Sequence, residues 1–271
     1  MGRIEKCANI IKELTEENPW FEIGASSIIG GRNYQQDFGY IYGDSRKAVA
    51  VVCDGMGGME GGERASRTAV EVFAKDLQEE KPDANIPGFL MREAERMDRE
   101  VAGLKDGEGK PLKSGTTMVA VCCMGSQMDW ISVGDSKIYL IRGETITALN
   151  VEHNYRQMLK EQLEAGQITQ EFYQREERTR QAEALTSFIG MDRINLIDWG
   201  KTPCKLEDGD IVMLCSDGVY KSIDHYQILG MIRDNDLDME IAADRLTAMA
   251  LRYGGKRQDN TTVILMRYRQ F

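Results

Sequence analysis

The chain has 271 residues, 42% of them hydrophobic and 29% charged, a balance that indicates a folded globular protein and excludes disordered, collagenous and membrane-embedded classes. Its formal net charge of -10 repels nucleic-acid backbones and anionic lipid surfaces, so neither nucleic acid nor a membrane is a favoured partner. The N-terminus lacks the apolar run of a secretory signal, and no segment has the length of a membrane-spanning helix, so we expect a cytoplasmic protein.

The first expected element is a short amphipathic helix, because apolar residues recur at helical spacing between Ile4 and Leu14, ahead of Pro19. We interpret residues 1–18 as a helical N-terminal extension and residues 19–271 as one large domain, since no linker-like stretch divides the chain. Short strand-like runs bounded by Gly, Asp and Asn come next, at 20–29, 39–42 and 48–53.

Two helical faces follow a glycine-rich segment, over residues 65–77 and 89–104. Strand patterns separated by Gly and Asp turns then return at 117–123, 128–133, 137–141 and 145–149. We expect these four strands to form an antiparallel meander.

The polar segment 152–182 is compatible with helices but has few apolar core positions, so we expect it to form a flap-like excursion on the surface. A strand at 211–215, a helical region at 226–253 and a strand at 261–268 complete the chain. Because strand blocks and helix blocks are segregated rather than strictly alternating, the order favours an α+β layered fold over a doubly wound parallel sheet.

Three apolar strands run directly into an aspartate beside a glycine, and a fourth aspartate precedes the last strand. These residues are Asp54, Asp135, Asp217 and Asp259. A single Asp-Gly pair is ordinary turn chemistry, but aspartate is a poor strand residue and is costly to bury unpaired, so four such positions indicate a shared role. If the strand ends converge, the carboxylates form an all-oxygen site suited to Mg²⁺ or Mn²⁺. With only His153 and His225 in the chain, a histidine-rich zinc or iron centre is excluded.

Eight short motifs, in order from about Phe21 to the C-terminus, resemble those of the PPM/PP2C family of metal-dependent protein phosphatases. They are Gly31-Arg32 through Gln36-Asp37, Val52 through Gly58, Gly62 through Ser66, Ser114 through Thr117, Val133 through Ser136, Leu185-Thr186 with Gly190, Cys215 through Gly218, and Asp259 through Thr262. The methionine after Asp54-Gly55 resembles the bacterial branch. The resemblance implies a central antiparallel β-sandwich flanked by helices, in four αββα layers, and hydrolysis of phosphoserine and phosphothreonine in proteins.

The resemblance also implies two Mn²⁺ or Mg²⁺ ions per chain, with a weaker third. The metal ligands carried over are Asp54, the carbonyl of Gly55, Asp217 and Asp259, with Asp37 acting through a water and Asp135 at the third ion. The catalytic residues would be Asp54, which bridges the two ions, and Arg32, which binds the substrate phosphate. Two bridged cations lower the pKa of a bound water for attack on phosphorus, and a guanidinium adds bidentate hydrogen bonds to phosphoryl oxygens.

Three positions depart from the family pattern. Many relatives have glutamate at Gln36, so a neutral amide takes the place of one carboxylate in the metal network and we expect a lower metal affinity. Eukaryotic relatives have histidine at Met56 and many bacterial ones have it at Met59, and a thioether can do no acid–base work at either position. No general acid is therefore assigned, a water is considered for that role, and His153 is interpreted as structural.

Two other functions stay open at this point. One is a pseudophosphatase or phosphoprotein-binding regulator, which loss of a core aspartate would favour, although none is lost. The other is a phosphohydrolase for small phosphate esters, because selectivity depends on surface grooves and the flap rather than on the shared chemistry. For the phosphatase, the expected partners are phosphorylated proteins, including targets of a Ser/Thr kinase.

Overall fold

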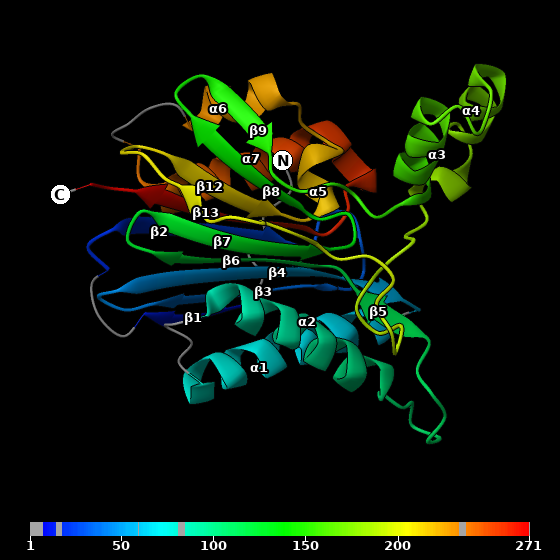
Figure 1. The fold of residues 1–271 in the computed structure, drawn as a ribbon, viewed down its shortest axis with the longest axis horizontal. Helices are drawn as coiled ribbons and strands as arrows, with labels where there is room; N and C mark the ends of the chain where they lie inside the picture. Colours follow the sequence, from blue (N-terminus) through cyan, green and yellow to red (C-terminus); the bar gives the residue numbers. More distant parts are fainter. Residues whose placement is uncertain (1–7, 15–17, 59, 81–84, 233–236, 271) are drawn as a thin grey trace.

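Two β-sheets pack face to face and each carries helices on its outer face, so the computed structural model has four layers (Figure 1). The structure describes residues 8–14, 18–58, 60–80, 85–232 and 237–270. Three apolar clusters fill the spaces between the layers, one between the sheets and one beneath each helical layer. The predicted α+β sandwich with helices on both sides is confirmed.

Among the described residues, the first sheet has eight strands. Its main path runs β1 (Ile10–Leu14), β3 (Asp37–Gly43), β4 (Lys47–Gly57), β6 (Met118–Met124), β7 (Gln127–Val133) and β10 (Asp198–Trp199), with β5 (Ser114–Thr116) on β4 and β11 (Cys204–Lys205) on β7. The second sheet runs β2 (Phe21–Ile28), β13 (Thr261–Tyr268), β12 (Ile211–Cys215), β8 (Lys137–Arg142) and β9 (Thr145–Ala148).

Strand β4 shows why a strand at the centre of the sandwich has a continuous run of apolar residues in its sequence. Val49, Val51 and Cys53 pack beneath the helices of the first sheet, whereas the intervening Ala50 and Val52 face the second sheet. Successive strand residues point to opposite faces, so a strand covered on both sides needs apolar residues at every position.

The helices cover the two sheets in groups. Helices α1 (Gly61–Glu80) and α2 (Ile86–Ala102) pack on the first sheet. The ring centroids of Phe73 in α1 and Phe89 in α2 lie 5.7 Å apart. The second sheet is covered by α5 (Asp217–Tyr220), α6 (His225–Ile232) and α7 (Met239–Gly254). None of the helices in the described ranges is long and apolar enough to cross a membrane.

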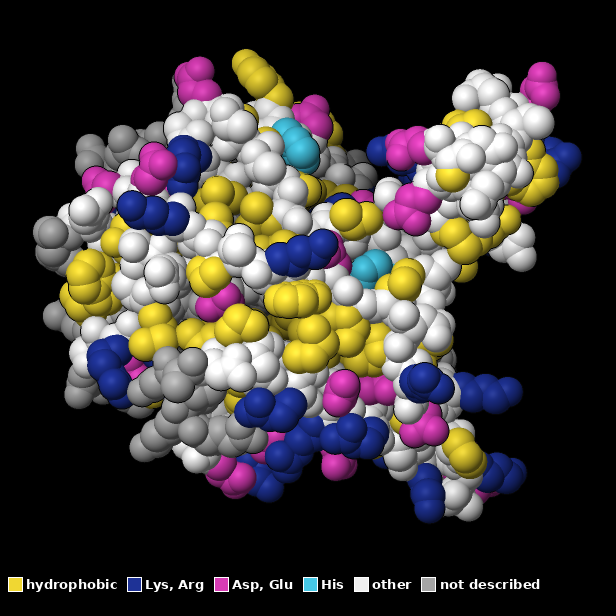
Figure 2. Space-filling view, in the orientation of Figure 1, with side chains coloured by type: hydrophobic (Ala, Val, Ile, Leu, Met, Phe, Trp, Pro, Cys, Tyr) yellow, Lys and Arg dark blue, Asp and Glu magenta, His cyan; other side chains and the backbone are white. Residues whose placement is uncertain are grey.

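Two further helices stand apart from the sandwich. Helices α3 (Tyr155–Glu164) and α4 (Gln170–Glu176) project beside the end of the sheets, and a hollow separates them from the main body (Figures 1 and 2). A short 3-10 turn, η1 (Arg180–Glu183), leads the chain back, and the second such turn is η2 (Gly255–Arg257). Helices α3 and α4 occupy the segment expected to form the flap, and we refer to residues 152–183 as the flap.

The predicted N-terminal helix is wrong over Ile10–Leu14, which forms strand β1 in parallel pairing with β3. Ile10 packs into the core between the sheets and Ile11 into the core beneath α1 and α2, so the chain is buried on alternate faces as a strand requires. The predicted boundary of a helical extension over residues 1–18 is therefore wrong for Ile10–Leu14, because β1 belongs to the first sheet. The earlier part of the predicted helix, residues 4–7, lies outside the described residues.

The expected four-strand meander is also wrong at its centre. Strands β6 and β7 pair with each other, and β8 pairs with β9, but β7 and β8 lie in different sheets. The chain crosses between the sheets at residues 134–136, where Gly134 has φ +104° and an added Cβ would lie 2.7 Å from Thr117 Cγ2. A glycine permits this sharp crossing, whereas a larger residue would be strained.

Candidate active site

One pocket at an end of the sandwich brings together residues from both sheets. Its volume is about 390 Å³. Six of the seven predicted site residues line it: Arg32, Asp54, Gly55, Asp135, Asp217 and Asp259. The seventh, Asp37, is fully buried next to this pocket, in direct register with Asp54 across β3 and β4.

Asp37 is a buried carboxylate with only one oxygen satisfied. Ser216 Oγ donates to Asp37 Oδ2 at 2.7 Å, but within the described part of the chain Oδ1 has no hydrogen-bond partner. Burial raises the pKa of Asp37 to about 7, the hydrogen bond from Ser216 opposes the rise, and the Asp217 carboxylate adds to it. A buried carboxylate oxygen without a hydrogen-bond partner is expected where a cation, or a water bound to a cation, occupies the site.

Asp54 lies at the centre of the acidic cluster. Its pKa lies well above the ordinary value, first because of burial and then because of the nearby carboxylates of Asp37 and Asp217, with smaller effects from two others. Several carboxylates that crowd one another in this way resist ionisation unless a cation compensates them. The first sheet therefore supplies Asp37 and Asp54 as a matched pair.

The second sheet supplies the opposite wall. Asp217 begins α5 directly after β12, and Asp259 lies just before β13, which is the neighbour of β12. Asp135 lies in the crossing between the sheets, where burial raises its pKa to about 7, Asp217 adds to the rise, and Lys221 opposes it. The four aspartates found from strand ends thus converge, as the sequence predicted.

Two cationic side chains already contact this cluster. Arg32 Nη2 lies 2.5 Å from Asp259 Oδ2. Lys221 Nζ lies 2.8 Å from Asp217 Oδ2 and 2.9 Å from Glu183 Oε2, with Asp135 Oδ2 at 3.7 Å. Burial alone would lower the pKa of Lys221, but the Asp217 and Asp135 carboxylates hold it above its ordinary value.

The donor set suits hard divalent cations in its chemistry. It consists of carboxylate oxygens and the Gly55 carbonyl, and two ammonium or guanidinium groups are drawn to the same oxygens. Among the described residues, however, no three Asp, Glu, His or Cys side chains are arranged as a ready-made metal cage. Arg32 and Lys221 instead engage Asp259 and Asp217, two of the aspartates that were predicted as metal ligands.

Gly55 is required by the close approach of three chain segments. An added Cβ would lie 2.1 Å from the carbonyl oxygen of Gly62 and 2.6 Å from that of Gln36. The Gly55 N–H donates to the Gln36 carbonyl at 2.9 Å, and the Gln36 side-chain amide donates to the Gly57 carbonyl at 3.2 Å. The side-chain amide of Gln36 is therefore engaged by a backbone carbonyl.

The other departures from the family pattern have different outcomes. Met56 lines the pocket, whereas Met59 lies outside the described residues. His153 is buried, its Nδ1 accepts a hydrogen bond from the Gly134 N–H at 3.1 Å, and burial lowers its pKa. These contacts hold the crossing next to Asp135, which is the structural role interpreted from the sequence.

Sequence reasoning assigned no part in the pocket to three residues that organise it, although Thr117 and Asn260 belong to the quoted motifs. Thr117 Oγ1 accepts a hydrogen bond from the Asp54 N–H at 2.9 Å and lies 2.7 Å from Ser136 Oγ, which connects the two sheets. Asn260 Oδ1 accepts from the Gln36 N–H at 2.8 Å, and its Nδ2 donates to the carbonyls of the loop on either side of Arg32. The third is Lys221, which its spacing of four residues from Asp217 in a helix-compatible run could have indicated.

Comparisons with known proteins agree with this architecture. The family model described as Protein phosphatase 2C matches residues 23–250. The serine/threonine phosphatase stp of Listeria welshimeri is 26% identical over 239 residues, which cover 87% of this chain and 90% of that protein. The crystal structure of the Mycobacterium tuberculosis serine/threonine phosphatase PstP/Ppp has a TM-score of 0.76 and 25% identity, covering 93% of this chain and 100% of that one.

A third comparison concerns the fold. The structure of the catalytic domain of PstP in complex with two manganese ions has a TM-score of 0.73 and 24% identity, covering 93% of this chain and 99% of that one.

Proposed function

Because the chain belongs to the protein phosphatase 2C family, we propose that its two-sheet acidic pocket hydrolyses phosphoserine and phosphothreonine in proteins with the help of two divalent metal ions. The observation that carries the proposal is the convergence of four aspartates in one pocket, beside the buried Asp37 carboxylate, one oxygen of which has no hydrogen-bond partner among the described residues. The enzyme is a protein serine/threonine phosphatase that depends on metal. The manganese ions in the related catalytic domain make Mn²⁺ our first choice of ion.

The ligands would come from both sheets. Asp54 would bridge the ions, the Gly55 carbonyl would hold one of them, and Asp217 and Asp259 would hold the other. Asp37 would act through a water, since its free oxygen lies in the buried wall. Bound there, the ions would activate water for attack on phosphorus and neutralise charge on the leaving oxygen.

Arg32 would bind the phosphate of the substrate. Its side chain is 57% exposed and reaches Asp259 from a loop held by Asn260. With Asp259 engaged by an ion, the Arg32 guanidinium would be free of this ion pair, and its fork of N–H donors would match two phosphoryl oxygens. Arg32 therefore orients the phosphorus toward the acidic cluster.

The leaving oxygen would receive its proton from water. Met56 lines the pocket at a position where a protonated side chain would serve, and a thioether cannot donate. No histidine is among the residues described as lining this pocket. The rate of hydrolysis should therefore depend on how readily the leaving oxygen can be protonated by solvent.

Phosphate release from a phosphothreonine peptide tests the proposal. With Mn²⁺ the wild type should turn over the peptide, and chelation should abolish turnover. Asp54→Asn should lower kcat at least about 100-fold, because it removes the bridging charge on which the transition state depends. The matched control is Asp224→Asn, which removes one exposed carboxylate and keeps an oxygen to cap Gln227 N–H at the start of α6.

Metal-independent turnover, or an Asp54→Asn variant as active as Asp224→Asn, would refute the mechanism. Faster hydrolysis of small phosphate esters than of phosphopeptides would instead assign the chain to small substrates. The proposed partners are phosphoproteins, including those phosphorylated by a Ser/Thr kinase.

A further inference from the structure

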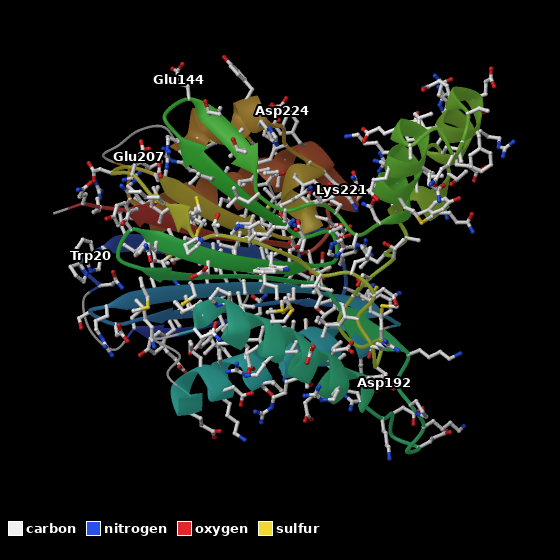
Figure 3. All side chains as sticks on the ribbon, viewed as in Figure 1. Trp20, Glu144, Asp192, Glu207, Lys221 and Asp224 are labelled. Carbon is white, nitrogen blue, oxygen red and sulfur yellow. The ribbon has the colours of Figure 1, made fainter. Side chains whose placement is uncertain are left out.

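Lys221 places a fixed positive charge inside the acidic cluster. It follows Asp217 by four residues, one turn of α5, and Figure 3 shows it at the end of that helix on the side that faces the flap. Its ammonium lies 2.8 Å from Asp217 Oδ2 and 3.7 Å from Asp135 Oδ2. Asp135 is the carboxylate at which the sequence predicted a third ion, and Asp217 is one of the predicted ligands of the other two ions.

We propose that the Lys221 ammonium takes the place of a third divalent ion, so that the chain binds two ions rather than three. The inference rests on the proposed function for the other two ions, whose proposed ligands are Asp54, the Gly55 carbonyl, Asp217 and Asp259. It concerns only the space between Asp135 and Asp217.

The chemistry of the two occupants makes them exclusive. A protonated lysine has three donors and no lone pair, so it satisfies carboxylates but cannot itself serve as a ligand to a metal ion. An ion held by the same two carboxylates would lie next to the ammonium, and the two positive charges would repel one another.

The surroundings of Lys221 hold it in this position. Asp217 is on the same helical turn, so its ion pair with Lys221 is set by local backbone geometry. Glu183 at the end of the flap accepts from the same ammonium at 2.9 Å. The Tyr220 hydroxyl donates to the Asp135 carbonyl at 2.9 Å, which fixes the backbone of the other carboxylate.

Compensation of charge supports the same conclusion. Asp135 is nearly buried, with 8% of its side chain exposed, and Lys221 is the cation that reaches it in an ion pair among the described residues. The nearby Lys137 pairs instead with Glu152 at 2.8 Å. Removal of Lys221 would leave Asp135 and Asp217 facing one another without a cation, which is the condition that attracts a metal ion.

The number of bound Mn²⁺ ions per chain tests the proposal, measured by equilibrium dialysis and elemental analysis. The wild type and Lys221→Arg should each bind two, because both keep a cation between the carboxylates. Lys221→Asp should bind three, since it removes the cation and adds a third carboxylate. The double variant Lys221→Asp, Asp135→Asn should return to two.

Two results would overturn the proposal. One is a third ion in the wild type that Asp135→Asn removes. The other is a Lys221→Asp variant that melts as the wild type does and still binds two ions.

If Lys221→Asp fails to fold, Lys221→Met replaces it, because methionine is neutral and of similar length. That variant should gain a third, weaker ion, and its failure to do so also counts against the inference. A wild type that binds no Mn²⁺ at all would refute the proposed function, which is a different outcome from binding three.

Discussion

Gly55→Ala tests whether the close approach at the centre of the site is as tight as the structure shows. The new Cβ would lie 2.1 Å from the Gly62 carbonyl oxygen and 2.6 Å from that of Gln36. Both are backbone atoms, so neither can rotate away, and the segments before β3 and at the start of α1 must move. Overpacking of this kind costs about 1 to 3 kcal/mol of unfolding free energy, or more.

The expected loss can be measured as a change in melting temperature. In a domain of this size 1 kcal/mol corresponds to about 2 to 4 °C, so metal-free Gly55→Ala should melt about 2 to 12 °C below the wild type. The proposed carbonyl ligand moves with the backbone, so affinity for Mn²⁺ should also fall, by about 10- to 100-fold, a range seen when the support of a metal ligand is disturbed.

Differential scanning calorimetry in chelator and a Mn²⁺ titration give the two readouts. The matched control is Gly58→Ala, three residues further along, where an added Cβ meets nothing within 4 Å among the described residues. It should stay within about 0.5 kcal/mol of the wild type. Equal melting temperatures for the two alanine variants would show that the clash is absent and that this account of Gly55 is wrong.

Further predictions concern pH, the packing of one loop, and the flap. Burial raises the pKa of Asp37 from 3.8 to about 7, so between these pH values the folded chain holds a proton that the unfolded chain releases. The unfolding free energy of the metal-free protein should therefore fall as pH rises from about 4 to about 7. Urea unfolding across that range should show a shallower fall in Asp37→Asn. Asp98 is buried and its Oδ1 accepts from the N–H groups of Gly190 and Met191 at 2.6 and 2.8 Å, so Asp98→Ala should cost about 3 kcal/mol and Asp98→Asn roughly half of that by urea unfolding. Equal losses in the two variants would contradict the hydrogen-bond explanation. Glu183→Gln weakens the ion pair with Lys221, so amide exchange in the flap should quicken while exchange in β12 is unchanged; equal change in both would argue against a local tether.

The centre of the fold was predictable because its strands are buried on both faces. The residues of β4 from Ala48 to Cys53 are all apolar, which is the pattern of a strand covered on both faces. The helices that became α1 and α2 show one apolar face each, which is the pattern of a surface helix over a sheet.

Two errors arose where local pattern and long-range pairing disagree. Ile11 and Leu14 are spaced as in a helix, but β1 is defined by its partner β3, which lies more than 20 residues further along the chain. Likewise, a short turn between β7 and β8 looks like a hairpin in sequence, and only the sandwich as a whole determines that the chain changes sheets there.

The site divides in the same way. The aspartates at strand ends were identifiable because a carboxylate at the end of a buried strand is unusual. The contribution of Asn260 and Thr117 was not, since Asn and Thr are common near turns. The spacing of Lys221 from Asp217 is a signal, but a weak one, because a lysine four residues after an aspartate is common in helices. Their importance comes from partners in the other sheet or in the flap.

The acidic site draws Asp37 and Asp54 from one sheet and Asp217 and Asp259 from the other. Ions bound between these aspartates would link the two β-sheets, so the affinity for ions should depend on how well the two sheets are aligned. A cavity in the distant inter-sheet core, as in Val121→Ala, would then loosen ion binding although Val121 touches none of the ligands, and loading with ions would restore the alignment.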